Sequence, residues 1–140
     1  MAAVCGRKYF TEVWKMKREQ ILSPKCGECH GPYALGTKMG NMIFTTQIGT
    51  DVSGEYVPGG VKEQTKATME NAKAVLEAAG ATMDNVAKVT IYICDINKIP
   101  EMNEVYKSYF PKGDYPARCC TQCVSMVEGC LVEMEFTAVL

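Results

Sequence analysis

The chain has 140 residues, of which 47% are apolar, and its formal net charge at neutral pH is -1. This length and composition are typical of one globular domain, which buries enough surface to fold without a disulfide or a metal. Because the charges nearly balance, no long-range field attracts phosphates, and we do not expect a nucleic acid as partner. No stretch is long and apolar enough for a membrane span or a secretory signal, so we expect a cytoplasmic protein without a membrane partner.

The N-terminal segment is expected to be an extension of the domain. Residues 1–16 contain basic and aromatic side chains, but Glu12 argues against an organelle transit peptide, which is usually poor in acids. No internal repeat, low-complexity stretch or linker interrupts residues 17–140. We therefore expect one domain over residues 17–140.

Glycine-rich turns divide the first part of this domain. Gly40 and Asn41 separate a possible strand from the apolar residues 42–48, which predicts a β-hairpin. Residues 52–60 contain three glycines and a proline, so we expect a loop there.

Two amphipathic helices are predicted after this loop, with a strand between them. Over residues 61–79, one face repeats at intervals of three and four, and it comprises Thr65, Thr68, Met69, Ala72, Leu76 and Ala79. Gly80 supplies a left-handed stop. Residues 89–94 alternate between apolar and more polar side chains, as in a strand with two different faces. The second helix is expected over residues 99–110, with Pro100 in its first turn and a stripe of Ile99, Met102, Tyr106 and Tyr109.

Two further strands are expected from Arg118 onward, and the last has two distinct rows of side chains. The apolar row comprises Val132, Met134, Phe136 and Ala138, and the other comprises Leu131, Glu133, Glu135 and Thr137. The apolar row should face the helices, which can cover only one side of a sheet of four to six strands. The opposite side is either covered by another subunit, as we predict, or it faces solvent with two ordinary surface glutamates.

Arg118 and Glu133 are the first candidates for chemistry. Arg118 begins one strand and Glu133 lies on the next strand along the chain. A planar guanidinium holds a carboxylate through two parallel hydrogen bonds and keeps its proton, and a carboxylate can position water or take a proton from it. The pair therefore predicts a site for a small carboxylic acid.

The cysteine motifs point to chemistry that the rest of the chain does not support. Cys26 to His30 matches the Cys-x-x-Cys-His pattern of covalent haem attachment, but the chain has one histidine and no export signal. Cys120 and Cys123 form a second Cys-x-x-Cys pair, about ninety residues from the first, instead of the fifteen to twenty of common zinc ribbons. Nothing orients Cys119 or Cys120 toward His30 as a thiol nucleophile. We expect no metal, and most of the eight cysteines should be small buried side chains.

Several segments, taken in order, resemble the Rid family of reactive-intermediate (imine) deaminases, also known as YjgF-type proteins. Each segment is short, but together they span nearly the whole chain in register. The segments are Gly31-Pro32-Tyr33, residues 40–45, Gly54-Glu55, Gly59-Gly60, Glu63-Gln64-Thr65, residues 71–80, residues 102–106, Tyr109-Phe110, Pro116-Ala117-Arg118 and residues 131–135.

The resemblance implies a chorismate-mutase-like α+β fold: a single domain with a mixed β-sheet and two helices packed on one face. It also implies a homotrimer with active sites in the clefts between subunits. The implied activity is hydrolysis of 2-imino and enamine acids, of the 2-aminoacrylate and 2-iminopropanoate type, to 2-oxo acids and ammonia. The implied partners are therefore small carboxylate-bearing imines or 2-oxo acids, and no cofactor is required.

The resemblance also implies roles for individual residues. Arg118 would hold the substrate carboxylate, Glu133 would position or activate water, and the backbone of Cys120 would contact the imine or the carboxylate. Tyr33 and Asn103 match further pocket positions of the family. Without the resemblance, Tyr33 reads as a buried ring and Asn103 as an amide on a helix surface.

One departure from the family pattern bears on the pocket. The family usually has Thr-Ser-Gly-Gln on its pocket-lining strand, whereas this chain has Thr45-Thr46-Gln47. Counting from Gly40 places Thr46 at the serine position, while counting back from Gln47 favours Thr45; we choose Thr46. Loss of the glycine removes a backbone amide suited to close approach and should narrow or alter the pocket.

Two other functions remain as alternatives. The first is a non-catalytic trimeric binder of small 2-oxo or imino acids, or a chaperone-like protein. The second is an endoribonuclease. A protein that binds RNA phosphates would be expected to have a cluster of basic residues, and this sequence lacks one.

Overall fold

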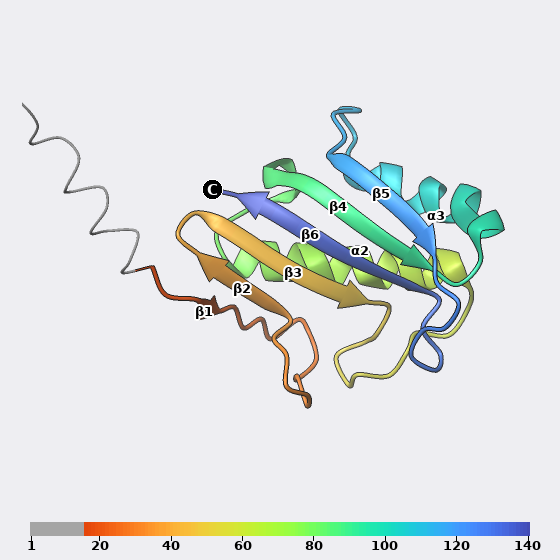
Figure 1. The fold of residues 1–140 in the computed structure, drawn as a ribbon, viewed down its shortest axis with the longest axis horizontal. Helices are drawn as coiled ribbons and strands as arrows, with labels where there is room; N and C mark the ends of the chain where they lie inside the picture. The colour runs from red at the N-terminus through yellow and green to blue at the C-terminus, as the bar shows by residue number, and fades with distance from the viewer. Residues whose placement is uncertain (1–15) are drawn as a thin grey trace, which may run out of the picture.

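The computed structural model describes residues 16–140 (Figure 1). Residues 1–15, which form most of the expected extension, lie outside the described part, so the division between extension and domain stays a prediction. The described residues contain a mixed sheet of six strands in the order β1-β2-β3-β6-β4-β5. The strands are β1 (Glu19–Gln20), β2 (Gly36–Met39), β3 (Met42–Ile48), β4 (Val86–Ile93), β5 (Ala117–Gln122) and β6 (Val132–Val139). Neighbouring strands are antiparallel except β4 and β5, which are parallel.

The helices α2 (Val61–Ala78) and α3 (Ile99–Tyr106) lie together on one face of this sheet, behind it in the view of Figure 1. This arrangement confirms the predicted α+β class, with a mixed sheet and two helices on one side. No helix within residues 16–140 is long and apolar enough to cross a membrane.

The local turns follow the glycine pattern of the sequence. Gly40 joins β2 to β3 with a φ of +61°, a left-handed conformation that a side chain disfavours, and the predicted hairpin is confirmed. The loop predicted over residues 52–60 contains no helix or strand, apart from an isolated bridge between Thr50 and Tyr56. Gly80 ends α2 with a φ of +82°.

The second helix is shorter than the sequence predicts. We expected it over residues 99–110, but α3 ends at Tyr106, and a single 3-10 turn over Lys107–Tyr109 follows it. Tighter turns of this kind are common where an α-helix ends. The predicted inner stripe is still present, because Met102 and Tyr106 are buried and Ile99 is partly buried.

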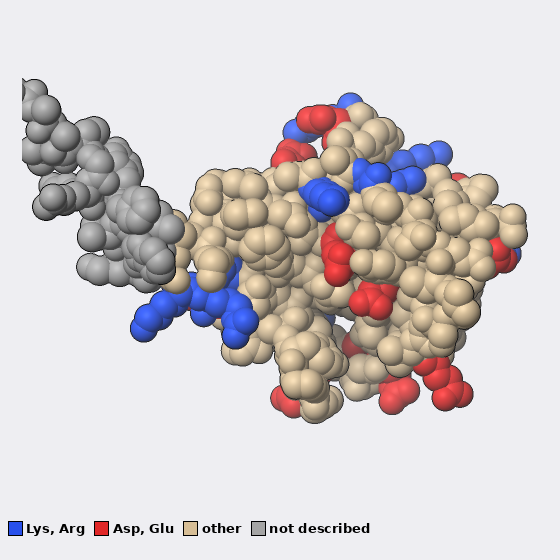
Figure 2. Space-filling model, in the orientation of Figure 1, with Lys and Arg blue, Asp and Glu red and all other residues tan. Residues whose placement is uncertain are grey.

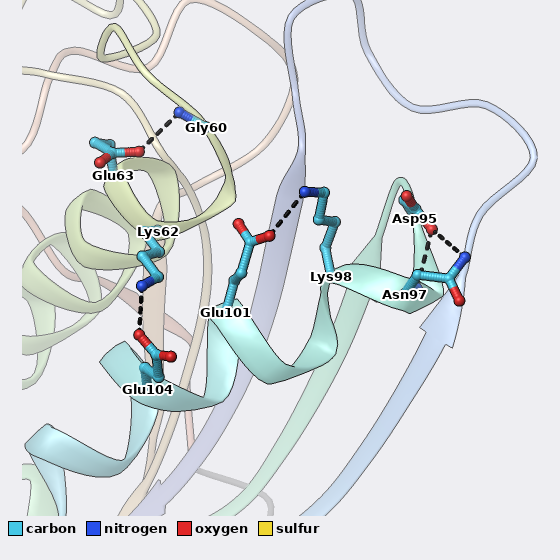
Figure 3. Close-up of polar contacts among 8 residues, drawn as sticks. All are labelled: Gly60, Lys62, Glu63, Asp95, Asn97, Lys98, Glu101 and Glu104. Carbon is cyan, nitrogen blue, oxygen red and sulfur yellow. Dashed lines mark hydrogen bonds and ion pairs between the residues drawn. The ribbon is translucent and has the colours of Figure 1, made fainter.

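Polar contacts fix the start of each helix and join the two helices (Figure 3). Glu63 accepts a hydrogen bond from the backbone N–H of Gly60 at 2.7 Å, which caps α2. An ion pair between Lys62 and Glu104 links α2 to α3. Both of its partners are about half exposed, so water and salt screen the attraction and the pair contributes little to stability.

The sheet separates a buried row of side chains from an uncovered one. On β6, Val132, Met134, Phe136 and Ala138 are buried, as predicted, and α2 packs against this side of the sheet. The other face is turned toward the viewer in Figure 2 and is mostly uncharged, with acidic atoms near its middle. Met42 and Phe44 of β3 remain 40% exposed on that face. Its coverage by another subunit stays a prediction.

A buried glutamine connects α2 to the segment that leads into β6. Gln64 is only 3% exposed. Its Nε2 donates to the carbonyl of Gly129 at 2.7 Å, and its Oε1 accepts from the N–H of Leu131 at 2.9 Å. Because both groups belong to the chain just before β6, Gln64 sets where that strand begins.

We predict that Gln64→Leu lowers the free energy of unfolding by about 2–4 kcal/mol, because two partly buried backbone groups would lose their partners. Urea denaturation at a fixed protein concentration measures this change. The exposed residue Lys66 on the same helix provides the control, and Lys66→Leu should change the stability by less than about 0.5 kcal/mol. Equal stability of Gln64→Leu and the wild type would contradict the assignment.

Candidate active site

Arg118 lies on the helix side of the sheet, at the start of β5. It is paired with Val89 of β4, whose side chain is fully buried against the helices. The Nη1 of Arg118 donates to Oδ1 of Asn103 at 2.7 Å, and its guanidinium carbon lies 4.8 Å from the ring centroid of Tyr106. No carboxylate within residues 16–140 forms an ion pair with Arg118. The guanidinium is therefore held in place but keeps donors for an anion.

The cavity around this arginine has a volume of about 400 Å³. We call it the arginine pocket, and it is lined by Asn103, Tyr106, Lys107, Tyr115, Pro116 and Arg118. Two basic side chains, an amide and two aromatic rings form its walls, and no acidic residue lines it. This composition suits a small carboxylate with an apolar part.

Glu133 lies in a different cavity, on the uncovered side of the sheet. This cavity has a volume of about 500 Å³, and we call it the glutamate pocket. It is formed by the loop before β2, the end of β3, the loop after β3 and the loop before β6, and its lining includes His30, Tyr33, Thr46, Tyr56, Val127 and Glu133. Figure 2 shows it as a hollow at the lower edge of the sheet face.

The environment of Glu133 favours its neutral form. Burial raises the pKa of its carboxyl group, and the like charge of Glu135 raises it further. Burial likewise raises the pKa of the nearby Tyr56 hydroxyl to about 12, with the thiol of Cys130 as a further cause. Glu133 is thus a stronger base than an ordinary surface glutamate, and Tyr56 remains a neutral hydrogen-bond donor.

Arg118 and Glu133 do not meet within one chain. The sequence places them on successive strands, but β4 lies between β5 and β6 in the sheet. Arg118 is in register with Val89 on the helix side, whereas Glu133 is in register with Tyr92 on the opposite side. Val89 and Tyr92 are three positions apart on β4, and side chains an odd number of positions apart point to opposite faces, so Arg118 and Glu133 lie on opposite sides of the sheet within a single subunit.

The structure distinguishes between the two threonines of β3. Thr45 is 4% exposed, and its Oγ1 donates to the carbonyl of Leu35 at 2.6 Å and accepts from Nε2 of Gln47 at 2.7 Å. Thr46 points to the uncovered face and lines the glutamate pocket. Of the two, only Thr46 lines this pocket, and the choice of Thr46 as a substrate-binding residue stays a prediction.

The remaining site candidates divide between the two pockets. Tyr33 is 63% exposed and lines the glutamate pocket, so it is not a buried core ring. The side chain of Asn103 accepts a hydrogen bond from Arg118, so Asn103 is not a free surface amide.

Cys120 is paired with Ile91 and lies on the helix side of the sheet, as Arg118 does. Burial raises the pKa of its thiol, although Arg118 acts in the opposite direction. A thiol of this kind is a poor nucleophile at neutral pH.

The cysteines differ from the expectation that most of them are buried. Of the seven in the described residues, only Cys26 and Cys130 are buried, Cys119 is exposed, and none forms a disulfide. Within residues 16–140 no cluster of three or more His, Cys, Asp or Glu side chains could hold a metal ion.

Several pocket residues were not predicted from the sequence, among them His30, Tyr56 and Tyr106. His30 and Tyr56 come from loops whose approach to Glu133 depends on long-range packing, and the sequence carried no signal for it. Tyr106 was assigned only to the helix core. Tyr106 lies three positions after Asn103 on α3, and residues at this spacing share one face of a helix. This spacing was a signal that Tyr106 and Asn103 could line the same pocket.

Comparison of the sequence with known proteins shows the family to which the chain belongs. Residues 26–140 match the sequence model of the family described as endoribonuclease L-PSP. The chain belongs to this family, which is the Rid or YjgF-type family that its motifs resemble. A RutC family protein of Pyrococcus abyssi is 44% identical over 88% of this chain and 98% of its own length. The human 2-iminobutanoate/2-iminopropanoate deaminase is 37% identical over 87% of this chain and 90% of its own.

Solved structures of family members have the same fold. Escherichia coli TdcF, crystallised with bound serine, superposes with a TM-score of 0.82 at 34% sequence identity, covering 87% of this chain and 98% of its own. The Escherichia coli YjgF gene product gives a TM-score of 0.81 at 30% identity, covering 86% of this chain and 98% of its own.

We predict that Glu133→Gln makes the Rid-family domain more stable at pH 7 but not at pH 4. A carboxyl group whose pKa is raised by folding stabilises the fold while it is neutral, and this stabilisation is lost as the pH rises through the raised pKa. Glutamine cannot ionise, so the variant should unfold a few degrees higher at pH 7. At pH 4, below the ordinary carboxyl value of 4.5, the difference should vanish.

Thermal unfolding at both pH values measures this effect. The exposed Glu55 in the loop after β3 supplies the control, because Glu55→Gln should show no such pH-dependent gain. A Glu133→Gln variant that is equally stable relative to the wild type at both pH values would show that the carboxyl group is not destabilised by its surroundings.

Proposed function

We propose that this protein hydrolyses reactive 2-imino acids and their enamine tautomers, of the 2-aminoacrylate and 2-iminopropanoate type, to 2-oxo acids and ammonia. The observation that carries the proposal is Arg118, a guanidinium held by Asn103 and Tyr106 that forms no ion pair with a carboxylate within residues 16–140. Such a group is suited to the carboxylate that all these substrates share. Relatives of 37% and 38% identity are named 2-iminobutanoate/2-iminopropanoate deaminases, which supports the same chemistry.

We further propose that the protein is a homotrimer in which the arginine pocket of one subunit meets the glutamate pocket of the next. Within one chain the two pockets lie on opposite sides of the sheet and share no lining residue. The uncovered face carries half-exposed apolar residues such as Phe44, which another subunit would bury. Assembly would then place Arg118 and Glu133 on the two sides of one substrate.

In this arrangement the substrate carboxylate binds Arg118, and the adjacent C=N carbon faces the partner's pocket. Glu133 accepts a proton from a water molecule as the water oxygen attacks that carbon, and it passes this proton to the nitrogen, which gives a tetrahedral carbinolamine with one hydroxyl and one amino group. Glu133 then transfers the hydroxyl proton to the amino group, the C–N bond breaks as the C=O bond forms, and ammonia and the 2-oxo acid leave. An enamine first takes a proton on carbon to become the imine. Because an imine carbon is already electrophilic, orientation of the water supplies much of the acceleration.

The other predicted site residues have supporting roles in this proposal. Thr46 and Tyr33 line the glutamate pocket and would contact the substrate or the water from that side. The backbone of Cys120 lies two residues from Arg118 on the same strand and would contact the carboxylate or the imine. The thiol takes no part in the reaction.

A second candidate function is supported by one observation. The strand β3 reads Thr45-Thr46-Gln47 where the family pattern has a glycine before the glutamine. If the loss of that amide prevents the imine from approaching Glu133, the protein would bind 2-oxo acids without turnover. Calorimetry with pyruvate separates the two functions, because only a binder gives heat without accelerating hydrolysis.

The activity is tested by generating 2-aminoacrylate with a serine dehydratase and following the release of pyruvate. The wild type should accelerate release, and Arg118→Ala should lower kcat/KM by about 10- to 150-fold, the loss expected for one charged hydrogen-bonding interaction. Arg118→Lys keeps the charge but not the paired donors and should also be impaired. No acceleration by the wild type, or an undiminished rate in Arg118→Ala, would rule the proposal out.

Mixed trimers test whether the site is shared between subunits. Arg118→Ala and Glu133→Gln should each be nearly inactive alone. When they are unfolded and refolded together in equal amounts, about a quarter of the interfaces should pair an intact arginine with an intact glutamate, because each subunit supplies one half-site at random. Activity near a quarter of the wild-type value is expected, and the absence of any recovery would place both residues in one subunit's site.

A further inference from the structure

Tyr106 is the most deeply buried residue of the arginine pocket, and its ring contacts Arg118. Its side chain is 3% exposed, and the guanidinium carbon of Arg118 lies 4.8 Å from the ring centroid. The ring also packs against Phe110, with the centroids 5.1 Å apart, and Phe110 meets Tyr115 edge-on at 6.0 Å. The ring beneath the guanidinium is therefore fixed by an aromatic cluster.

The hydroxyl group of Tyr106 does not explain this arrangement. It is buried and has no hydrogen-bond partner among residues 16–140. Burial raises the pKa of the phenol to about 12, although Arg118 acts in the opposite direction, so the group carries no charge at neutral pH. Arg118 is met by the π face of the ring and not by an anionic oxygen.

We infer that Tyr106 is a positioning residue for Arg118: its ring and the amide of Asn103 hold the guanidinium so that its remaining donors face an incoming carboxylate. This inference rests on the proposed function, which assigns the carboxylate to Arg118. Tyr106 acts through the arginine: the hydroxyl group is the only polar atom of its side chain, and it is buried.

The geometry explains why one ring and one amide suffice. Asn103 accepts from Nη1 at 2.7 Å and so fixes one edge of the guanidinium plane, while the ring covers one of its faces. The donors on Nε and Nη2 have no partner within residues 16–140 and lie in the same plane, as two parallel bonds to a carboxylate require. An arginine has several rotatable bonds, so ordering it before the ligand arrives removes an entropic cost from binding.

Two substitutions separate the ring from the hydroxyl. Tyr106→Phe keeps the π face and removes a hydroxyl without a partner, so pyruvate should bind within about twofold of the wild-type affinity. Tyr106→Leu removes the π face and should raise the pyruvate Kd by about 3- to 30-fold, the range of a partly desolvated cation–π contact. Where Tyr106→Leu does not fold, Tyr106→Met fills similar space without a π face and takes its place.

Calorimetry with pyruvate gives the affinities, and the N–Hε resonance of Arg118 in ¹⁵N NMR gives a signal that packing alone would not move. Ring current from Tyr106 should shift this resonance in the wild type and in Tyr106→Phe, and the shift should disappear in Tyr106→Leu. In the imine assay, Tyr106→Leu should raise KM more than it lowers kcat, since the reacting atoms are not touched.

The NMR measurement keeps this test independent of turnover. If the wild type does not hydrolyse imines or bind pyruvate, the proposed function fails, but the Arg118 resonance still shows whether Tyr106 holds the arginine. An unchanged resonance or an unchanged Kd in Tyr106→Leu overturns the inference. Equal losses in Tyr106→Phe and Tyr106→Leu also overturn it, because the hydroxyl and not the ring would then be the contributing group.

Discussion

The arrangement of this domain depends on one constraint: the two helices cover only one face of the six-stranded sheet. Side chains alternate along each strand, so every strand delivers one row to the helices and one row to the uncovered face. Val132, Met134 and Phe136 form the core on one side, and Glu133 and Glu135 remain on the other. The same alternation that builds the core thereby divides the candidate active site into two pockets.

Each pocket is supported by a rigid element instead of a flexible side chain alone. On the helix side, α3 supplies the amide and the ring that hold Arg118. On the uncovered side, Gln64 of α2 reaches the chain just before β6 and so sets where Glu133 emerges. Arg118 and Glu133 are thus positioned by the two helices, α3 and α2, although the two side chains lie on opposite sides of the sheet.

Much of the fold was predictable because its signals are local. The alternation over residues 89–94, the helical spacing over residues 61–79 and the glycine at Gly40 each depend on neighbours within a few residues. The shortened α3 and the exposure of most cysteines were not predictable in this way, because both depend on what the rest of the chain places beside them.

Within the candidate site, residue type and position pointed to Arg118 and Glu133, the family resemblance added Asn103 and Thr46, and the alternation of side chains assigned Glu133 to the row opposite the core. Only the tertiary structure decided that Arg118 faces the helices, on the side of the sheet opposite Glu133. The physical reason is that side-chain alternation within a strand is local, whereas the order of strands in a sheet depends on long-range pairing. The sequence does not show that β4 lies between β5 and β6, and this strand order leaves Arg118 and Glu133 in two separate pockets.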